Sequence, residues 1–489
     1  MKFKRAAALF AAAILLFSGC GTRGNGGGDT SEPETTARDM SKYDPREAVS
    51  LKSEHFSVTN DKLAYFFYKD YYDAVNLYYE SYFAPYGLDP TKDLKEQNYD
   101  NTATWFDYFM GVTVQNVLNY LRLAEAAIDR GAGLDDADRA KAAAELDDIK
   151  AAAEEFGMSL QEFLDSRFGE GLTEESLREC LELYYLSDKQ FSYISDSVAA
   201  DDASLEAYYE ENKKDFLFVD FRKVEVRADQ TEYANEEARK AGFAEAERQS
   251  RYIEASAGID EYVERGIAYY KSINDTLEVP LSDEEIYTKV TNIVVQYGFN
   301  DTTAFGKWAF ADGRRAGDIV MLDNGSGIYT VYYLVTPPYR AENKTVNYRY
   351  SCFTDEEKAK AALAEFESGE RSGERFADLV SGADGAQGNG SLRENVDLGE
   401  TAPAVEVWLF DKERRQGDCG LAEQDGYYYL LYYEGDGKIS WKLSAENAIR
   451  SGVINTELAK YAAKYKIESD KDNIYLIPGE NAYTRAVKE

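Results

Sequence analysis

The chain has 489 residues, among them 55 lysines and arginines and 90 aspartates and glutamates, for a formal net charge of -35. A surface of this sign repels phosphate backbones, which argues against nucleic acid as a partner. It also gives no attraction to an anionic membrane surface, so any membrane attachment needs a separate device. Hydrophobic residues make up 44% of the chain and aromatic residues 14%, so packed cores are expected rather than a disordered tail.

Such a device is found at the N-terminus. Basic residues at positions 2, 4 and 5 precede an apolar run, residues 6–17, that is too short to span a bilayer and has the layout of a signal peptide. The run ends in Phe-Ser-Gly-Cys, which resembles the lipobox of bacterial lipoproteins, with Phe17 at the usual leucine position and Cys20 as the lipidated residue. We therefore expect a signal peptide over 1–19 and a lipidated, flexible linker over 20–50. The alternative is an ordinary secretory signal with an incidental cysteine.

The other cysteines, Cys180, Cys352 and Cys419, form an odd set, which argues against a disulfide framework. Their neighbours show no CxxC or Cys/His spacing, and His55 is the only histidine, which excludes the common zinc sites. No phosphate-binding loop, nucleophile elbow or dinucleotide fingerprint is present. We therefore expect no metal and no cofactor, and three cysteines that are small buried apolar side chains.

The pattern from about residue 51 to residue 216 is helical, because apolar residues recur at i, i+3 and i+4. Helices are predicted over residues 63–77, 105–128 and 142–156. Two more follow Ser159, where Glu162 completes a capping box, and Thr173, which is a simple cap.

An internal repeat follows. Residues 308–318 and 408–418 share Trp, Phe, an Arg-Arg pair, Gly and Asp at identical spacing, and a Gly-aromatic strand follows each copy. Two consecutive small domains are the interpretation that suits this period. Within each copy we interpret the Trp and Phe as core residues beneath a hairpin and the Arg-Arg-x-Gly-Asp segment as a structural turn. The alternative is that the Trp and Phe are exposed anchors for a peptide.

The second copy has a complete set of predicted elements. They are a strand over 346–352, a helix over 354–367 capped by Thr354 with Glu357, a helix over 403–410 and a hairpin over 417–434. The first copy carries a long helical insert over 236–270 and a second predicted helix over 282–295. At the C-terminus, Ile454, Leu458, Tyr461 and Tyr465 form one apolar helical stripe, which needs a packing partner.

Three segments of the helical region resemble the N-terminal chaperone domain of the SurA/PrsA foldases. They are Gly-Met-Ser-x-x-Glu-Phe at 157–163, Leu-Thr-Glu-Glu-x-Leu-Arg at 172–178 and Tyr-Tyr-Glu-Glu-Asn-Lys at 208–213. Members of this family are exported folding factors, lipoproteins in Gram-positive bacteria, whose helical domain is followed by one or two parvulin-type peptidyl-prolyl isomerase domains.

The resemblance implies a multidomain fold: an all-α chaperone-like domain, two α+β parvulin-like domains and a C-terminal helix. The expected boundaries are 51–216 for the helical domain, 217–340 for a divergent parvulin-like domain, 343–436 for a second one, and 437–489 for a C-terminal helix that packs on the helical domain.

The resemblance also implies where catalysis would occur. Active parvulins have two buried histidines, in the first and last strands, and apolar Met and Phe side chains that grip the proline. In the second copy the two histidine positions are occupied by Tyr350 and Tyr428. The Met and Phe positions fall at Thr401 or Ala402 and at Val405. In the first copy the histidine positions are occupied by Lys223 and Tyr329. Tyrosine titrates near about 10 and does not reproduce a histidine network. We therefore assign no catalytic residue, and for polypeptide binding we expect Tyr350, Val405, Trp408 and Tyr428.

These expectations describe a membrane-anchored, extracytoplasmic chaperone that binds unfolded exported polypeptides without catalysis, in a bacterium of the Gram-positive type. Two alternatives stay open. One is a lipoprotein that binds a sugar or peptide ligand, and the other is an active isomerase with an atypical site.

Overall fold

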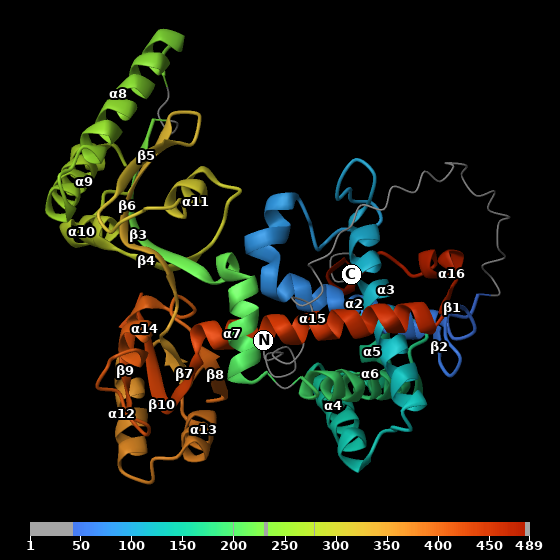
Figure 1. The fold of residues 1–489 in the computed structure, drawn as a ribbon. Coiled ribbons are helices and arrows are strands. Elements are labelled where there is room, and N and C mark those ends of the chain that lie inside the picture. Colours follow the sequence, from blue (N-terminus) through green and yellow to red (C-terminus); the bar gives the residue numbers. More distant parts are fainter. Residues whose placement is uncertain (1–42, 199, 229–232, 278, 485–489) are drawn as a thin grey trace. The chain divides into compact units, whose positions relative to one another are not determined.

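The computed structural model describes residues 43–198, 200–228, 233–277 and 279–484. These residues fall into two compact units, one made of 43–198 together with 449–484 and the other of 200–448 (Figure 1). The first unit is mainly helical, and the second combines helices with two four-stranded antiparallel sheets. No helix among the described residues is long and apolar enough to cross a bilayer.

The helical unit is built from five main helices and a small sheet. The helices are α2 (Asn60–Tyr78), α3 (Trp105–Asp129), α4 (Asp136–Glu155), α5 (Leu160–Phe168) and α6 (Glu174–Asp196). Two short turns, η2 (Tyr79–Phe83) and η3 (Ala84–Tyr86), extend α2. The sheet contains β1 (Val49–Lys52), β2 (Ser57–Thr59) and β11 (Glu468–Ser469), and α16 (Lys471–Tyr475) follows it. The predicted capping box of Ser159 with Glu162 and the simple cap at Thr173 are both confirmed.

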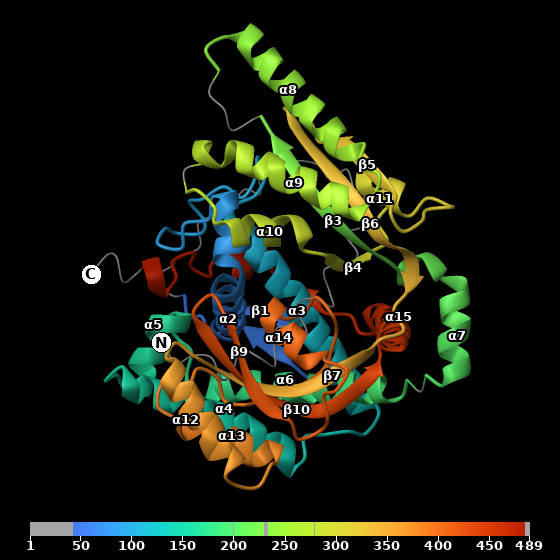
Figure 2. The same ribbon diagram turned by 90° about the vertical axis from the view of Figure 1, so that its left-hand side faces the viewer.

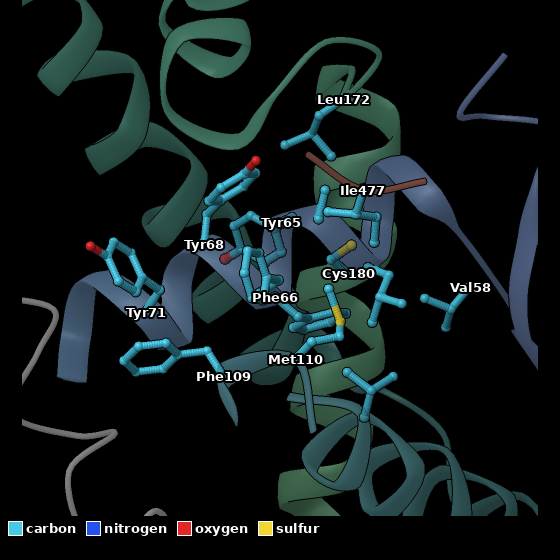
Figure 3. Close-up of a cluster of buried hydrophobic side chains, with 14 of the residues drawn as sticks. Val58, Tyr65, Phe66, Tyr68, Tyr71, Phe109, Met110, Leu172, Cys180 and Ile477 are labelled. Atoms are coloured by element: carbon cyan, nitrogen blue, oxygen red, sulfur yellow. The ribbon is translucent and has the colours of Figure 1, made fainter. Parts of the chain in front are cut away.

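The core of this unit is aromatic, and α2 supplies much of it. Tyr65, Phe66, Tyr68 and Tyr71 are buried against residues of α3 and α6 and against Ile477 (Figure 3). The Tyr68 hydroxyl lies within hydrogen-bond distance of the backbone carbonyls of residues 478 and 480, at 2.9 and 2.8 Å, and can donate its one proton to either. The segment 477–480 is therefore held by hydrogen bonding as well as by apolar packing.

The C-terminal part of α15 (Ser440–Lys464) also packs in the helical unit. Ile454 and Leu458 are buried with Leu123 and Ile194, and Tyr461 lies against the same cluster. The Tyr461 hydroxyl accepts a hydrogen bond from Gln190 Nε2 at 2.9 Å. The segment after α15 is not a continuation of that helix, because it forms β11 and α16.

The two α+β domains of the second unit have the same topology. Their strand orders are β4-β3-β6-β5 and β8-β7-β10-β9. The first contains β3 (Leu217–Arg227), α8 (Glu236–Glu254), α9 (Ile259–Ile273), α10 (Asp283–Thr291), β4 (Val294–Gly298), α11 (Ala304–Ala309), β5 (Ile319–Asp323) and β6 (Ile328–Arg340). The second contains β7 (Lys344–Phe353), α12 (Glu356–Glu367), α13 (Gly373–Gly382), β8 (Leu392–Val396), α14 (Pro403–Leu409), β9 (Cys419–Gln424) and β10 (Tyr427–Ile439). The duplication predicted from the sequence is therefore present in the fold.

Each sheet is covered on both faces. In the first domain α8, α9 and α10 pack on one face and α11 on the other (Figure 2). In the second domain α12 and α13 cover one face and α14 the other. The two faces follow from strand alternation, since neighbouring residues of a strand point to opposite sides.

The repeated motif forms the same turn twice. In the second domain Arg414 Nε donates to the carbonyl of Trp408 at 3.0 Å, and its guanidinium lies 3.7 Å from the indole centroid. Asp418 accepts from the backbone N–H of Arg415 at 2.9 Å. The first domain repeats these contacts one hundred positions earlier at 2.8, 4.6 and 3.2 Å. The glycine of the turn, Gly317 in the first copy and Gly417 in the second, has a φ of 92° or 89°. This backbone conformation is one that glycine adopts more readily than other residues. The turn is structural, as predicted.

Three local predictions need correction. The N-cap of α12 is Asp355, whose carboxylate accepts from two backbone N–H groups, and not Thr354. The insert over 236–270 is two helices, broken at Gly258. The helix expected over 282–295 ends at Thr291, because the β-branched residues that follow pair with β3 as strand β4.

A fourth difference concerns α7 (Asp202–Glu211), which was expected in the helical domain. The structure groups α7 with the second unit. Its Tyr209 ring lies 4.3 Å from the guanidinium carbon of Arg340 and 5.7 Å from the ring of Trp441. Arg340 also bonds Glu206 at 3.1 Å. This cation–π and ion-pair cluster is a tertiary contact that the helical pattern alone cannot reveal.

Candidate functional site

The face of the second sheet covered by α14 carries most of the residues expected to bind polypeptide. Val405 of α14 is 4% exposed and belongs to a buried cluster with Tyr348, Leu409 and Leu431. Tyr350 and Trp408 are partly buried against the same cluster. Three of the four expected residues, Tyr350, Val405 and Trp408, are therefore brought together. We call this surface the α14 face.

The fourth residue, Tyr428, lies on the opposite face. It packs with the cluster formed by α12 and α13, whereas its neighbour Tyr429 packs with the α14 face. The hydrogen-bonded register explains this, because Tyr350 pairs with Leu431 and strand parity then places 429, 431 and 433 on the same side. The sequence analysis did not select Tyr429 as a binding residue. Its spacing of two and four residues from Leu431 and Tyr433 would have placed it on the same face of the strand.

Trp408 is fixed within the α14 face by its neighbours. One side of the indole meets the Arg414 guanidinium at 3.7 Å. Another side lies against Gly420 of β9, where an added Cβ would come within 2.7 Å of the indole Nε1. Trp408 therefore forms a fixed wall of this face. It is partly buried against the core cluster and is not one of the fully buried core residues.

Three tyrosines lie on this face, with Tyr348 buried and Tyr350 and Tyr429 partly buried. The rings of Tyr348 and Tyr350 lie 6.0 Å apart, and the Arg393 guanidinium lies 5.2 Å from the Tyr350 ring. Burial raises the pKa of the Tyr429 hydroxyl, and nearby Cys352 and Tyr350 add to the effect. Burial likewise raises the pKa of Tyr348. These hydroxyls stay protonated near neutral pH, so they can donate and accept hydrogen bonds but cannot act as bases there.

The groups that could perform acid–base chemistry lie elsewhere. His55 is in the helical unit, where its Nδ1 lies 2.6 Å from Glu125 Oε2 and this contact raises its pKa. Burial raises the pKa of the Cys352 thiol, which reduces its thiolate fraction. The positions carried over from the parvulin histidines are occupied by Tyr350 and Tyr428 on opposite faces. The α14 face can thus bind through apolar and hydrogen-bonding contacts, and it offers no group poised near neutral pH for proton transfer.

A second aromatic surface lies in the helical unit, where η2 and η3 follow α2. The side chains of Tyr82 and Tyr86 are 41% and 61% exposed, and their ring centroids lie 5.1 Å apart. Tyr99 and Tyr108, with centroids 4.7 Å apart, are half-buried and neighbour Tyr82. We call these four residues the tyrosine patch. Exposed aromatic groups of this kind mark interaction surfaces more often than isolated apolar residues do.

The remaining expectations concern metal binding, the three cysteines and the lipid anchor. Within the described ranges, no group of three or more His, Cys, Asp or Glu side chains is arranged to hold a metal ion. Cys180 and Cys352 are buried and Cys419 is partly buried, and all three are free thiols. Cys20, the residue expected to carry the lipid, lies outside the described residues.

Comparisons with known proteins give a distant likeness to solved structures. No family model matches the chain, and no curated protein matches its sequence. Among solved structures, a match comes from work on the virulence factor PEB4 and the periplasmic protein Cj1289, two structurally related SurA-like chaperones of Campylobacter jejuni. The match has 11% sequence identity, covers 87% of this chain and 99% of the other, and has a TM-score of 0.21. At this TM-score the two chains do not superpose as wholes, and the match carries no further argument.

Proposed function

We propose that the chain is a membrane-anchored, extracytoplasmic chaperone-like protein that holds unfolded exported polypeptides and does not catalyse proline isomerisation. The proposed anchor is the lipid on Cys20, and the signal-peptide pattern of residues 1–19 supports export. The resemblance of the helical segments to the SurA/PrsA foldases supports the same class of function.

The observation that carries the proposal is the α14 face. Tyr350 and Tyr429 present flat rings with polar tips beside the apolar Val405, and the fixed indole of Trp408 closes one side. Tyrosine supplies large contact area at low conformational cost and tolerates many partners, because each ring offers both an apolar face and a hydroxyl. A surface of this chemistry suits extended chains of varied sequence.

The tyrosine patch of the helical unit supports the proposal independently. Tyr82 and Tyr86 are exposed on a π-helical turn and a 3₁₀ turn, and not within a regular helix. The surrounding chain is strongly acidic, so clients with a positive net charge are favoured over acidic ones.

The test is a refolding assay with the purified full chain, read in two ways. One arm follows light scattering of an unfolded client. The other follows a proline-limited refolding phase, which takes on the order of tens to hundreds of seconds. We expect suppressed aggregation and an unaccelerated proline phase. Acceleration at catalytic amounts would contradict the non-catalytic part of the proposal, and unchanged aggregation would contradict the chaperone part.

A further inference from the structure

Arg222 and Arg349 occupy the same position in the two duplicated sheets. Arg222 of β3 pairs across the sheet with Tyr333 of β6, and Arg349 of β7 pairs with Tyr432 of β10. Each arginine lies on the face covered by the longer helices, opposite α11 or α14. The two sites therefore began as copies of one another, and their differences can be compared residue by residue.

In the second domain the arginine is neutralised internally. Arg349 Nε donates to Glu434 Oε1 at 2.5 Å, and Nη1 donates to the carbonyl of Gly390 at 3.0 Å. The two charged side chains are 19% and 21% exposed. A pair buried to this extent is well satisfied, and no charge is left over for a ligand.

In the first domain the partner is missing. Glu434 is the extra residue of a β-bulge in β10, between the pairs Tyr433–Tyr348 and Gly435–Asn347. The corresponding bulge in β6 lies between Leu334 and Thr336, so its extra residue is Val335. Valine cannot accept a hydrogen bond from a guanidinium.

Arg222 consequently keeps one unsatisfied donor, its Nε, although the residue as a whole is partly exposed. Its Nε is buried and has no hydrogen-bond partner among the described residues, and no ion pair at Arg222 is found in the same residues. A buried charged donor without a partner carries a substantial free-energy cost, because its water is removed and nothing replaces it.

Arg222 also lines a cavity of about 400 Å³ between β3, α9 and α10. Ile259 and Val263 of α9 form its apolar wall, and Thr291 of α10 adds a hydroxyl. The volume falls in the range of small-molecule sites. The cavity therefore gives a ligand direct access to the side of the sheet on which the unpaired arginine lies.

Two acidic side chains line the same cavity and narrow the choice of ligand. Asp260 and Glu264 lie one turn apart on α9, and both residues are exposed. A simple anion that approached Arg222 would be repelled by these carboxylates, whereas a simple cation would meet the arginine. A ligand that carries a carboxylate and a cationic group side by side can pair with the arginine and with the two acidic side chains at the same time.

We propose that this cavity binds a carboxylate with an adjacent cationic group, with the carboxylate on Arg222 and the cation beside Asp260 and Glu264. A free basic amino acid and the basic C-terminal residue of a polypeptide share this chemistry. The site is separate from the α14 face and does not depend on the chaperone proposal.

Calorimetric titration of the full chain tests the site with three probes: L-arginine, the tripeptide Gly-Gly-Arg with a free C-terminal carboxylate, and the same tripeptide amidated at its C-terminus. We expect saturable binding of at least one probe with a free carboxylate, and at least about ten-fold weaker binding of the amidated form. Binding of L-arginine would identify a free amino acid as the source, and binding of the tripeptide alone would identify a polypeptide end. No saturable binding at millimolar concentration, or equal binding of the amidated tripeptide, would overturn the proposal.

Two variants place the binding at Arg222. Arg222→Gln should weaken binding about ten-fold or more, because the charged donor is lost. Val335→Glu retains Arg222 but supplies the internal carboxylate of the second domain, so it should weaken binding to a similar extent while the domain stays folded. Arg248→Gln removes an exposed arginine of α8, paired with Glu245, and should leave binding unchanged. Full binding by both Arg222→Gln and Val335→Glu would overturn the assignment.

Discussion

The Nδ1 of His55 lies 2.6 Å from Glu125 Oε2, and the backbone N–H of His55 donates to Glu125 Oε1 at 2.9 Å. Glu125 is 2% exposed, so this contact joins the β1–β2 hairpin to a buried carboxylate of α3. Because His55 is the only histidine of the chain, its titration can be isolated by one substitution.

The first prediction is a pH dependence from this pair. The hydrogen bond to Glu125 raises the pKa of His55 from 6.5, so the protonated ring stabilises the folded state. This contribution is fully present below the unfolded pKa and is lost as pH rises through the higher folded pKa. Thermal unfolding midpoints should therefore fall on going above pH 6.5, and the fall should be smaller in His55→Gln. Parallel pH profiles for both proteins would show that the contact contributes nothing.

The second prediction concerns Asp70, a carboxylate of α2 that accepts hydrogen bonds from Thr113 Oγ1 at 2.9 Å and Asn116 Nδ2 at 3.1 Å. Burial raises its pKa, so the charged form weakens the folded state as pH rises through that pKa. Asp70→Asn should raise the free energy of unfolding at neutral pH, and the gain should vanish in acid.

A neighbouring carboxylate supplies the control for Asp70. Asp73 pairs with Lys69 at 2.7 Å on the same helix. Asp73→Asn removes an attraction rather than a burial cost, so it should lower stability or leave it unchanged. Denaturant titrations at neutral and acidic pH measure both variants. A loss of stability in Asp70→Asn at neutral pH would show that its two hydrogen bonds outweigh the cost of burying the charge.

The third prediction tests the fixed position of Trp408. Gly420→Ala places a methyl group 2.7 Å from the indole Nε1, so the ring must move. Overpacking of this kind costs about 1–3 kcal/mol. Gly382 of α13 has open space around its Cβ position and no positive φ, so Gly382→Ala should be neutral or slightly stabilising. Chemical unfolding monitored by tryptophan fluorescence distinguishes the two, and equal stability of both variants would contradict the packing described.

The fourth prediction separates the two faces of β10. Tyr429 lies on the α14 face and Tyr428 on the face covered by α12 and α13. Tyr429→Ala should weaken suppression of client aggregation several-fold, on the order of 1 kcal/mol of binding free energy. Tyr428→Ala should leave suppression unchanged at a temperature where both variants are folded, as checked by circular dichroism. The reverse order of effects would move the proposed binding surface to the other side of the sheet.

Local signals in the sequence predicted the turns and several helix starts correctly. The capping box at Ser159 needs only residues three apart, and the repeated turn needs contacts within about ten residues. Such contacts depend on short-range geometry that the sequence encodes directly. The helix ends near Gly258 and Thr291 were predicted less well. Gly258 separates two helices within one helical pattern, and after Thr291 β-branched residues continue as strand β4.

The candidate site was predicted only in part. Tyr350, Val405 and Trp408 share the α14 face, but Tyr428 does not, and Tyr429 takes its place. A shift of one residue in a strand reverses its face, so an error of one position in matching a family motif is enough to place a side chain on the wrong side.

The sequence by itself determined the duplication, the turn chemistry and the aromatic character of both domains, because each rests on residues close together in the chain. Only the tertiary structure decided which arginine is neutralised. Arg349 and Arg222 occupy equivalent strand positions, but their environments depend on residues about one hundred positions away, Glu434 in one domain and Val335 in the other. The bulge that presents those residues arises from strand pairing, and pairing between distant segments is set by the folded sheet.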